Sequence, residues 1–389
     1  MKYKLASDNW DKKEINAIKE VIKSNRFTYG PKVTKFENLF AKYFGCKYAI
    51  MTNSGSSANL ISIASLFFTK KNKLKKGDEV IVPAVSWSTT FNPLQQYGLK
   101  LKFVDINLNT LNVDIEKFEK AITKKTKLCV AVSILGNPAH LDKMREICNK
   151  KKIIFFEDNC ESMGAKINNK YCGTFGDIST HSTFFSHHIS TIEGGVIMTN
   201  NKEIYELGKS LRSHGWTRDL PKNNLLVNKS KNSFYEAYRF ILPGYNLRPT
   251  EISAAIGIVQ LKKLKKSIDM RRKNAEYFTK IFSDNEMFII QQENHYSSWF
   301  SFTLILKPKY KKLKNKIFNL LKKYSIEFRI ITGGSFLRHE VRKYFNYSVF
   351  KNINNANYAH DYGFFVGNYP KDLKKEIKYL HSVLSKVKR

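Results

Sequence analysis

Short apolar runs alternate with stretches of helical periodicity from about residue 13 to 250, and this alternation predicts the fold of most of the chain. The short runs predict strands and the periodic stretches between them predict helices. Strands are expected at 48–52, 79–83, 101–104, 128–134, 153–156 and 196–199, with helices at 60–68 and 141–149. Because strands alternate with helices, we predict an α/β fold with a mainly parallel sheet covered on both faces.

From about residue 250 the pattern changes, and a second, smaller unit is expected. It predicts a long helix at 251–282, interrupted or continuous, a strand at 301–306, a helix at 311–324, a strand at 326–330 and a final helix at 371–387. We therefore divide the 389 residues into an N-terminal arm with a large domain over 1–250 and a small α+β domain over 251–389.

The chain is strongly basic, with 67 Lys and Arg against 33 Asp and Glu and a formal net charge of +34. Such a charge is typical of proteins that bind nucleic acid, but it is equally typical of a surface with evenly spread lysines. No RNA-recognition signature, zinc finger or basic region with heptads accompanies these lysines, so no nucleic-acid partner is expected. A further interpretation is that the charge attracts an anionic substrate such as a nucleotide diphosphate sugar.

Five cysteines occur without a C-x-x-C pair, which indicates reduced thiols in the cytoplasm and argues against a structural zinc site. The first ten residues lack the apolar centre of a signal peptide. No apolar run approaches the roughly 18 to 20 residues of a membrane helix. We expect a cytoplasmic protein that does not bind a membrane.

Several polar segments follow predicted strands, where ligands gather in such sheets. In Asn53-Ser-Gly-Ser-Ser-Ala-Asn59, small residues open a helix and could let backbone N–H groups approach a phosphate, although an ordinary N-cap turn has the same composition. Trp87 could stack on a flat ring or lie in the core. Asp158 could pair with a protonated ring nitrogen or cap a helix.

The segment Ser182-Thr-Phe-Phe-Ser-His187-His188-Ile-Ser-Thr-Ile-Glu193-Gly-Gly contains two adjacent histidines. It closely resembles the cofactor-lysine segment of the fold-type I sugar aminotransferases that use pyridoxal phosphate (PLP), the DegT/DnrJ/EryC1/StrS family. There the segment reads Ser-Phe-x-x-Thr-Lys, then five residues, then Glu-Gly-Gly. Counting back from Glu193 places His187 at the lysine position, and a one-residue gap would place His188 there instead. An imidazole cannot form the lysine's covalent linkage, but it can transfer protons near neutral pH.

The resemblance extends over the whole chain and implies a fold-type I homodimer with shared active sites. It implies that Gly55, Ser56, Ser57 and Ser182 bind the cofactor phosphate, that Trp87 stacks on the ring, and that Asp158 pairs with the ring nitrogen. Glu161 stands where the family has glutamine, and its role stays open between the ring hydroxyl and proton transfer. Asn246 is expected to reach the phosphate of the neighbouring subunit. Candidates for substrate binding are Arg248, Arg329 and His214, although each is also compatible with a structural role.

The chain resembles the 3-dehydratase branch of that family in three features. These are the histidine at the lysine position and the segments Glu-Asp-Asn-Cys-Glu-Ser and Pro-Ala-Val-Ser-Trp-Ser-Thr-Thr. This implies a PLP/pyridoxamine-phosphate (PMP) enzyme that removes the C3 hydroxyl of a nucleotide-linked 4-keto-6-deoxy hexose, with GDP-4-keto-6-deoxy-D-mannose as the expected substrate and glutamate as the amine donor. The pathway implied is colitose synthesis for lipopolysaccharide. No cysteine follows Cys172, so we expect no iron–sulfur cluster. Two alternatives remain: a nucleotide-sugar aminotransferase that uses another lysine, for example Lys166, and a basic binding protein without enzymatic activity.

Overall fold

The alternating apolar runs form one eight-stranded sheet in the computed structural model, which describes residues 2–388. From β8 to β13 the neighbouring strands are parallel, whereas β9 is antiparallel to both β1 and β8, so the prediction of a mainly parallel sheet is confirmed. The order across the sheet is β1 (Tyr48–Thr52), β9 (Gly195–Thr199), β8 (Ile178–Ser182), β5 (Ile154–Asp158), β4 (Thr126–Val132), β2 (Glu79–Pro83), β3 (Lys100–Val104) and β13 (Tyr347–Val349).

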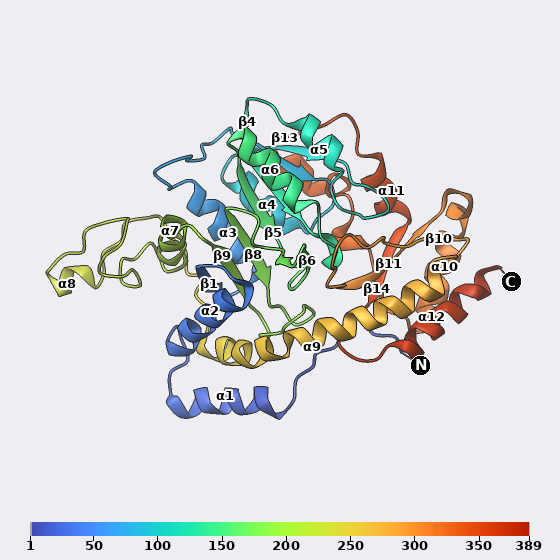
Figure 1. The fold of residues 1–389 in the computed structure, drawn as a ribbon, viewed down its shortest axis with the longest axis horizontal. Helices are drawn as coiled ribbons and strands as arrows, with labels where there is room; N and C mark the ends of the chain where they lie inside the picture. The colour runs from blue at the N-terminus through green and yellow to red at the C-terminus, as the bar shows by residue number, and fades with distance from the viewer. Residues whose placement is uncertain (1, 389) are drawn as a thin grey trace.

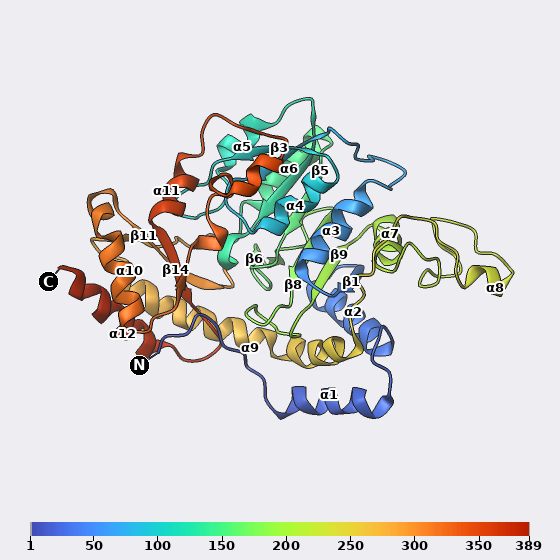
Figure 2. The same ribbon diagram turned by 180° about the vertical axis from the view of Figure 1, so that it is seen from behind.

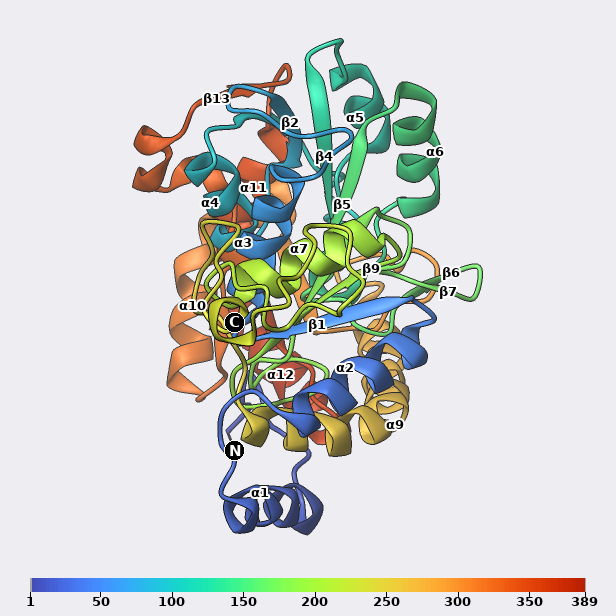
Figure 3. The same ribbon diagram turned by 90° about the vertical axis from the view of Figure 1, so that its left-hand side faces the viewer.

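Helices cover both faces of this sheet (Figure 3). Along β2 the side chains alternate, because Val80 and Val82 join one apolar cluster and Ile81 joins another. The first cluster includes side chains of α3 (Gly55–Leu66), α4 (Ser88–Gln96) and α7 (Lys202–Arg212). The second includes side chains of α5 (Ile115–Ala121) and α6 (Leu141–Lys151). The strands that end near the site are therefore held rigidly from both sides.

A second sheet lies beside the large one, on the side of the molecule where both chain termini lie (Figures 1 and 2). Its four antiparallel strands run in the order β10 (Phe288–Ile289), β11 (Ser301–Leu306), β14 (Gly363–Gly367) and β12 (Phe328–Arg329). The expected strand at 326–330 is shorter here. The expected helix at 311–324 is divided into a 3₁₀ turn, η2 (Pro308–Leu313), and α10 (Lys314–Lys323). The other helices of this half are α11 (Asn354–Tyr362) and α12 (Lys374–Ser385).

Helix α9 (Glu251–Phe282) is one continuous helix of 32 residues that runs beneath both halves (Figure 1). Thr250 caps its start, with the side chain accepting from Ser253 N. Gly257 lies within the helix at the point where it packs on Phe36, and a β-carbon there would lie 2.7 Å from the ring, so glycine permits this close packing. At about 1.5 Å per residue the helix extends roughly 48 Å, so it links α1 (Lys12–Ser24) and α2 (Pro31–Phe44) to α12.

Two features cross the predicted division at residue 250. Strand β13, from the C-terminal part, pairs with β3 of the large sheet, and Tyr3, from the N-terminal arm, pairs with Ile326 beside the second sheet. The remaining short elements are the hairpin β6 (Lys166–Ile167) and β7 (Lys170–Tyr171), and the 3₁₀ turns η1 (Ile134–Gly136), η3 (Ile331–Gly333), η4 (Phe336–Arg338), η5 (Glu340–Tyr344) and η6 (Lys386–Lys388).

Residues 213–250 form an arm that projects from the body, with α8 (Ser233–Glu236) near its tip (Figures 1 and 2). Four aromatic side chains of this arm are exposed, namely Phe234, Tyr235, Tyr238 and Phe240. Within residues 2–388, no helix combines the length and the apolar character that crossing a bilayer requires.

Candidate active site

A cavity of about 580 Å³ opens where the carboxyl ends of β5 and β8 meet the start of α3. This is the position that parallel sheets favour for ligands. The part of the chain up to residue 250, called the large domain below, supplies one wall, which includes Gly55, Trp87, Asp158, Ser182 and His187. The part after residue 250, called the small domain below, supplies the opposite side with Phe300, Arg329, Ile330, Thr332, Gly333 and Phe365.

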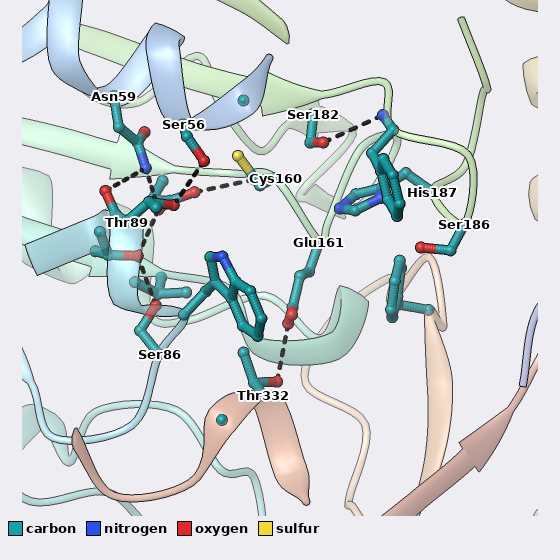
Figure 4. A pocket seen from close by; sticks show the side chains of 18 of the residues that line it. Ser56, Asn59, Ser86, Thr89, Cys160, Glu161, Ser182, Ser186, His187 and Thr332 are labelled. Carbon is teal, nitrogen blue, oxygen red and sulfur yellow. Dashed lines mark hydrogen bonds between the residues drawn. The ribbon is translucent and has the colours of Figure 1, made fainter. Parts of the chain in front are cut away.

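The start of α3 forms a cradle of small residues and hydroxyl groups. Ser54 caps the helix, because its Oγ accepts from Ser57 N at 3.0 Å. A β-carbon on Gly55 would lie 2.9 Å from the Ser182 β-carbon, so only glycine lets these two segments approach so closely. The hydroxyl groups of Ser56 and Ser182 lie on the cavity wall (Figure 4). Hydroxyl groups beside a helix N-terminus can bind a phosphate.

Asp158 ends β5 with its carboxylate held in a fixed orientation. Its Oδ2 accepts from Asn59 Nδ2 at 2.9 Å and from Thr90 Oγ1 at 2.7 Å, and its Oδ1 accepts from Cys160 N at 3.2 Å. The residue is 5 % exposed but still lines the cavity. A buried carboxylate with three donors on its own protein can present negative charge to a cationic ring nitrogen.

Glu161 extends into the cavity from the loop after β5 (Figure 4). Its Oε2 accepts from Leu135 N at 2.9 Å and from Thr332 Oγ1 at 3.2 Å. Burial, opposed by these two hydrogen bonds and reinforced by the charge of Asp158, raises the pKa of Glu161 to about 7. Glu161 can therefore hold or release a proton near neutral pH.

The two adjacent histidines point to different places. His187 lines the cavity, with its ring 5.1 Å from the Phe300 ring and 6.0 Å from the Phe184 ring. His188 is 1 % exposed and lies in the interior, where its Nε2 is 3.1 Å from Ser298 O. The register obtained by counting back from Glu193 therefore agrees with the geometry. Enclosure by the protein, together with the charge of Arg271, lowers the pKa of His187 to about 3, so the imidazole is neutral at neutral pH.

The other predicted site residues fall into two groups. Trp87 and Arg329 line the cavity, and Trp87 is 59 % exposed. Ser57 turns toward Ser54 rather than into the cavity. The side chains of His214, Asn246 and Arg248 lie outside the cavity of their own chain, at the base of the projecting arm, where Arg248 Nε donates to Asn246 Oδ1 at 3.1 Å.

Sequence reasoning missed several cavity residues. Asn59 and Thr90, which hold Asp158, lie inside segments that were singled out for other residues. Thr332 and Phe300 come from the small domain, and no local motif marks them. Thr332 has a backbone φ of +42°, which is rare outside glycine and places its hydroxyl group toward Glu161.

The residue types around the cavity restrict its chemistry. No lysine lines it within residues 2–388, and Lys166 lies on the β6–β7 hairpin with its Nζ 4.4 Å from the centre of the Tyr171 ring. In the same part of the chain, no group of three or more His, Cys, Asp or Glu side chains is arranged to hold a metal ion. The five cysteines are free thiols.

Comparisons with known proteins agree with this geometry. A model of the DegT/DnrJ/EryC1/StrS aminotransferase family matches residues 8–382. GDP-4-keto-6-deoxy-D-mannose 3-dehydratase of Escherichia coli O55:H7 is 53 % identical over 384 residues, covering 98 % of this chain and 99 % of that protein. The enzyme of the same name from Yersinia pseudotuberculosis is 52 % identical over 386 residues, covering 99 % and 98 %.

Solved structures of that enzyme are also similar to this chain. The Escherichia coli enzyme with bound hydrated PLP superimposes with a TM-score of 0.97 at 52 % identity, covering 99 % of both chains. A variant with bound GDP-perosamine and a form with a trapped PLP-glutamate geminal diamine each give a TM-score of 0.96 at 53 % identity, covering 98 % of this chain and all of the other.

Proposed function

Because the chain belongs to the DegT/DnrJ/EryC1/StrS aminotransferase family, we propose that it is a PLP-dependent 3-dehydratase of GDP-4-keto-6-deoxy-D-mannose. One observation carries this proposal: a cavity with phosphate-binding and ring-binding groups contains His187 and, within residues 2–388, no lysine. A lysine would return the cofactor to a covalent link and complete a transamination. Without one, the cofactor is held by non-covalent contacts and the side chain at that position can only exchange protons.

The residues present fit PLP. Glycine at position 55 lets the start of α3 approach Ser182 closely, and Ser56 and Ser182 place hydroxyl groups on the cavity wall. We assign the phosphate to this cradle, the ring face to Trp87 and the ring nitrogen to Asp158. Ser57, which the resemblance placed among the phosphate ligands, instead bonds to Ser54 through its N–H and its hydroxyl group. When bound, the cofactor supplies an electron sink and, in its PMP form, the amine that joins the sugar ketone. We propose that Glu161 either hydrogen-bonds the hydroxyl group of the cofactor ring or takes part in proton transfer.

His187 performs the proton transfers. Its neutral imidazole can accept a proton during the reaction, and the imidazolium formed can protonate the departing C3 hydroxyl group, so that the C3–O bond breaks and water leaves. Enclosure between the rings of Phe184 and Phe300 fixes the imidazole for both tasks. General acid–base catalysis of this kind contributes roughly 10²- to 10⁴-fold.

Glutamate is the amine donor, and the products are 2-oxoglutarate, ammonia and the GDP-linked 4-keto-3,6-dideoxy sugar. The bound GDP-perosamine and PLP-glutamate adduct of the similar enzymes support these ligand classes. Arg329, at the cavity wall, is a candidate for binding a carboxylate or a diphosphate. The reaction belongs to dideoxysugar synthesis for lipopolysaccharide, and we assign it to the cytoplasm.

A homodimer completes the site in this proposal. Asn246, Arg248 and His214 lie outside their own cavity, which is compatible with service to a neighbouring subunit. The arm that follows His214 exposes Phe234 at 90 %, and Phe185 and Ile192 are exposed beside the cavity. Exposed apolar side chains on the arm and beside the cavity are typical of surfaces that a second protein covers.

The test is whether the cofactor is linked to the protein. The purified protein is saturated with PLP, its visible spectrum is recorded before and after glutamate, and the holoprotein is reduced with borohydride. We expect a spectral change with glutamate and a denatured polypeptide of unmodified mass. The variant His187→Lys is the positive control, since its lysine should be trapped.

Two results would overturn the proposal. A modified lysine in the parent protein would indicate an aminotransferase, with Lys166 as the residue to inspect first. Absence of cofactor absorbance combined with salt-sensitive polyanion binding would indicate a basic binding protein.

A further inference from the structure

Arg271 on α9 is a buried positive charge without a carboxylate partner. The residue is 1 % exposed, and within residues 2–388 it takes part in no ion pair. Burial lowers the pKa of Arg271 to about 9, so the guanidinium keeps its charge at neutral pH. A buried charge without a counter-ion is costly, and an apolar side chain of similar size would occupy this place at lower cost. This free-energy cost indicates that Arg271 has a role beyond packing.

The two Nη groups of the guanidinium are directed at backbone carbonyl groups from three separate segments, whereas its Nε has no hydrogen-bond partner among residues 2–388. Its Nη1 donates to Phe300 O at 2.9 Å and to Asn368 O, and its Nη2 lies 3.4 Å from His187 O. Asn368 returns a hydrogen bond, because its Nδ2 donates to Arg271 O at 3.1 Å and to Trp299 O at 2.8 Å. Arg271 thus connects the loop that carries His187 to the start of β11 and the end of β14 in the small domain.

The same contacts surround the imidazole of His187. The Phe300 ring lies 5.1 Å from the His187 ring and 5.9 Å from the central carbon of the Arg271 guanidinium. The Phe300 ring therefore lies near both the side chain that exchanges protons and the buried cation.

We propose that Arg271 is a positioning residue for His187, which fixes the loop of the histidine against the small domain and keeps a positive charge beside the imidazole. The inference rests on the proposed function, because only a proton-transferring His187 gives this arrangement a task. A nearby cation disfavours imidazolium, so the imidazole stays available to accept a proton until the reaction supplies one.

After burial, Arg271 is the charged group that lowers the pKa of His187. His188, on the same loop, is itself buried and its pKa is lowered well below the ordinary value by burial and then by Arg271. Glu161, Glu193 and Arg329 face the cavity from the loops after β5 and before β9 and from β12. Arg272, the next residue on α9, is neutralised by Glu293.

The experiment compares Arg271→Met, Arg271→Lys and Arg272→Met. The protein without added cofactor is labelled with ¹³C at histidine Cε1, the His187 resonance is assigned from its loss in His187→Asn, and its protonation is followed by NMR against pH. In Arg271→Met we expect the midpoint of the His187 titration to rise by about one pH unit or more, the scale of removing one nearby charge in a partly buried site. Arg271→Lys, which keeps the charge, should show a smaller rise, and Arg272→Met should match the parent.

Parent-like titration of Arg271→Met, or an equal rise in Arg272→Met, would overturn the inference. If Arg271→Met does not fold, the titration midpoint of His187 is measured in the parent, in Arg271→Lys and in the control Arg272→Lys. A shift of the midpoint in Arg271→Lys that is no larger than in Arg272→Lys overturns the inference. The titration uses no substrate, so the inference can fail while dehydration activity persists, and the proposed function can fail while the shift is observed. In the loaded enzyme, the acid limb of the rate profile should move upward by the same amount in Arg271→Met.

Discussion

The two walls of the cavity are built differently. The wall from the large domain includes Gly55, Trp87, Asp158, Ser182 and His187, each at the end of a strand of the doubly covered sheet or in the short segment after it. The wall from the small domain combines one short segment, 329–333, with single side chains such as Phe300, and it meets the first wall through contacts between segments far apart in the chain. The first wall carries the groups for cofactor chemistry, and the second sets their environment.

The carboxyl groups of the cavity show what this difference does. Asp158 accepts all three of its hydrogen bonds from the large domain. Glu161 accepts one from Leu135 of the large domain and one from Thr332 across the cavity. The proton affinity of Glu161 therefore depends on how the walls approach each other, whereas the surroundings of Asp158 do not.

The largest expected effect comes from His187→Lys, on the first wall. The amine can link to the cofactor, and the imidazole that exchanges protons with the sugar is lost. We expect the dehydration half of the reaction to fall by roughly 10²- to 10⁴-fold. The measurement is formation of the 4-keto-3,6-dideoxy product by mass spectrometry, with cofactor absorbance confirming that the site is loaded. Dehydration at the parent rate would refute the assignment of His187.

A smaller effect on both half-reactions is expected from Asp158→Asn. The amide oxygen can still accept from Asn59 and Thr90, but the NH2 group then replaces the oxygen that accepts from Cys160 N, and the charge assigned to the ring nitrogen is lost. We expect glutamate turnover and dehydration each to fall by roughly 10²-fold, the scale of losing one preorganised electrostatic partner. Asp177→Asn, at a carboxylate that pairs with Arg145 outside the cavity, is the control. Unchanged glutamate turnover in Asp158→Asn would contradict the ring-nitrogen role.

Much of the first wall could be predicted from the sequence because its information is local. Strand periodicity located the end of β5, and small residues located the start of α3. The spacing from Glu193 distinguished His187 from His188. In the structure, His187 lines the cavity, and the side chain of His188 lies in the interior beside Ser298 O. The strand at Ser301–Leu306 was also predicted with the observed bounds.

The second wall could not be predicted in this way, for physical reasons. Thr332 reaches Glu161 through a positive φ angle, and Arg271 meets His187 O across 84 residues of sequence. Neither relationship has a local pattern, because each depends on tertiary packing that overrides local propensity. Strand β13 illustrates the same limit, since it crosses from the C-terminal part to pair with β3.

The smallest expected effect, and the one that tests the contact between the walls, concerns Glu161 and pH. Burial raises the pKa of Glu161 from its ordinary value of 4.5 to about 7. A carboxyl group whose pKa is raised by folding stabilises the folded state fully below pH 4.5, and this contribution is lost as the pH rises through 7. The free energy of unfolding of the parent should therefore fall relative to Glu161→Gln between about pH 5 and 8, by about 2 kcal/mol after allowance for solvent in the cavity.

Urea unfolding of both proteins at about pH 5 and pH 8 measures this difference, and Glu116→Gln, at an exposed side chain, is the control. Thr332→Val sharpens the test, because removal of a donor to the ionised carboxylate raises the pKa of Glu161 further and moves the loss of stability to higher pH. If Thr332→Val leaves the pH profile unchanged while Glu161→Gln alters it, Glu161 is controlled by the large domain alone. The dependence of this carboxyl group on the second wall would then be wrong, even though its burial would stand.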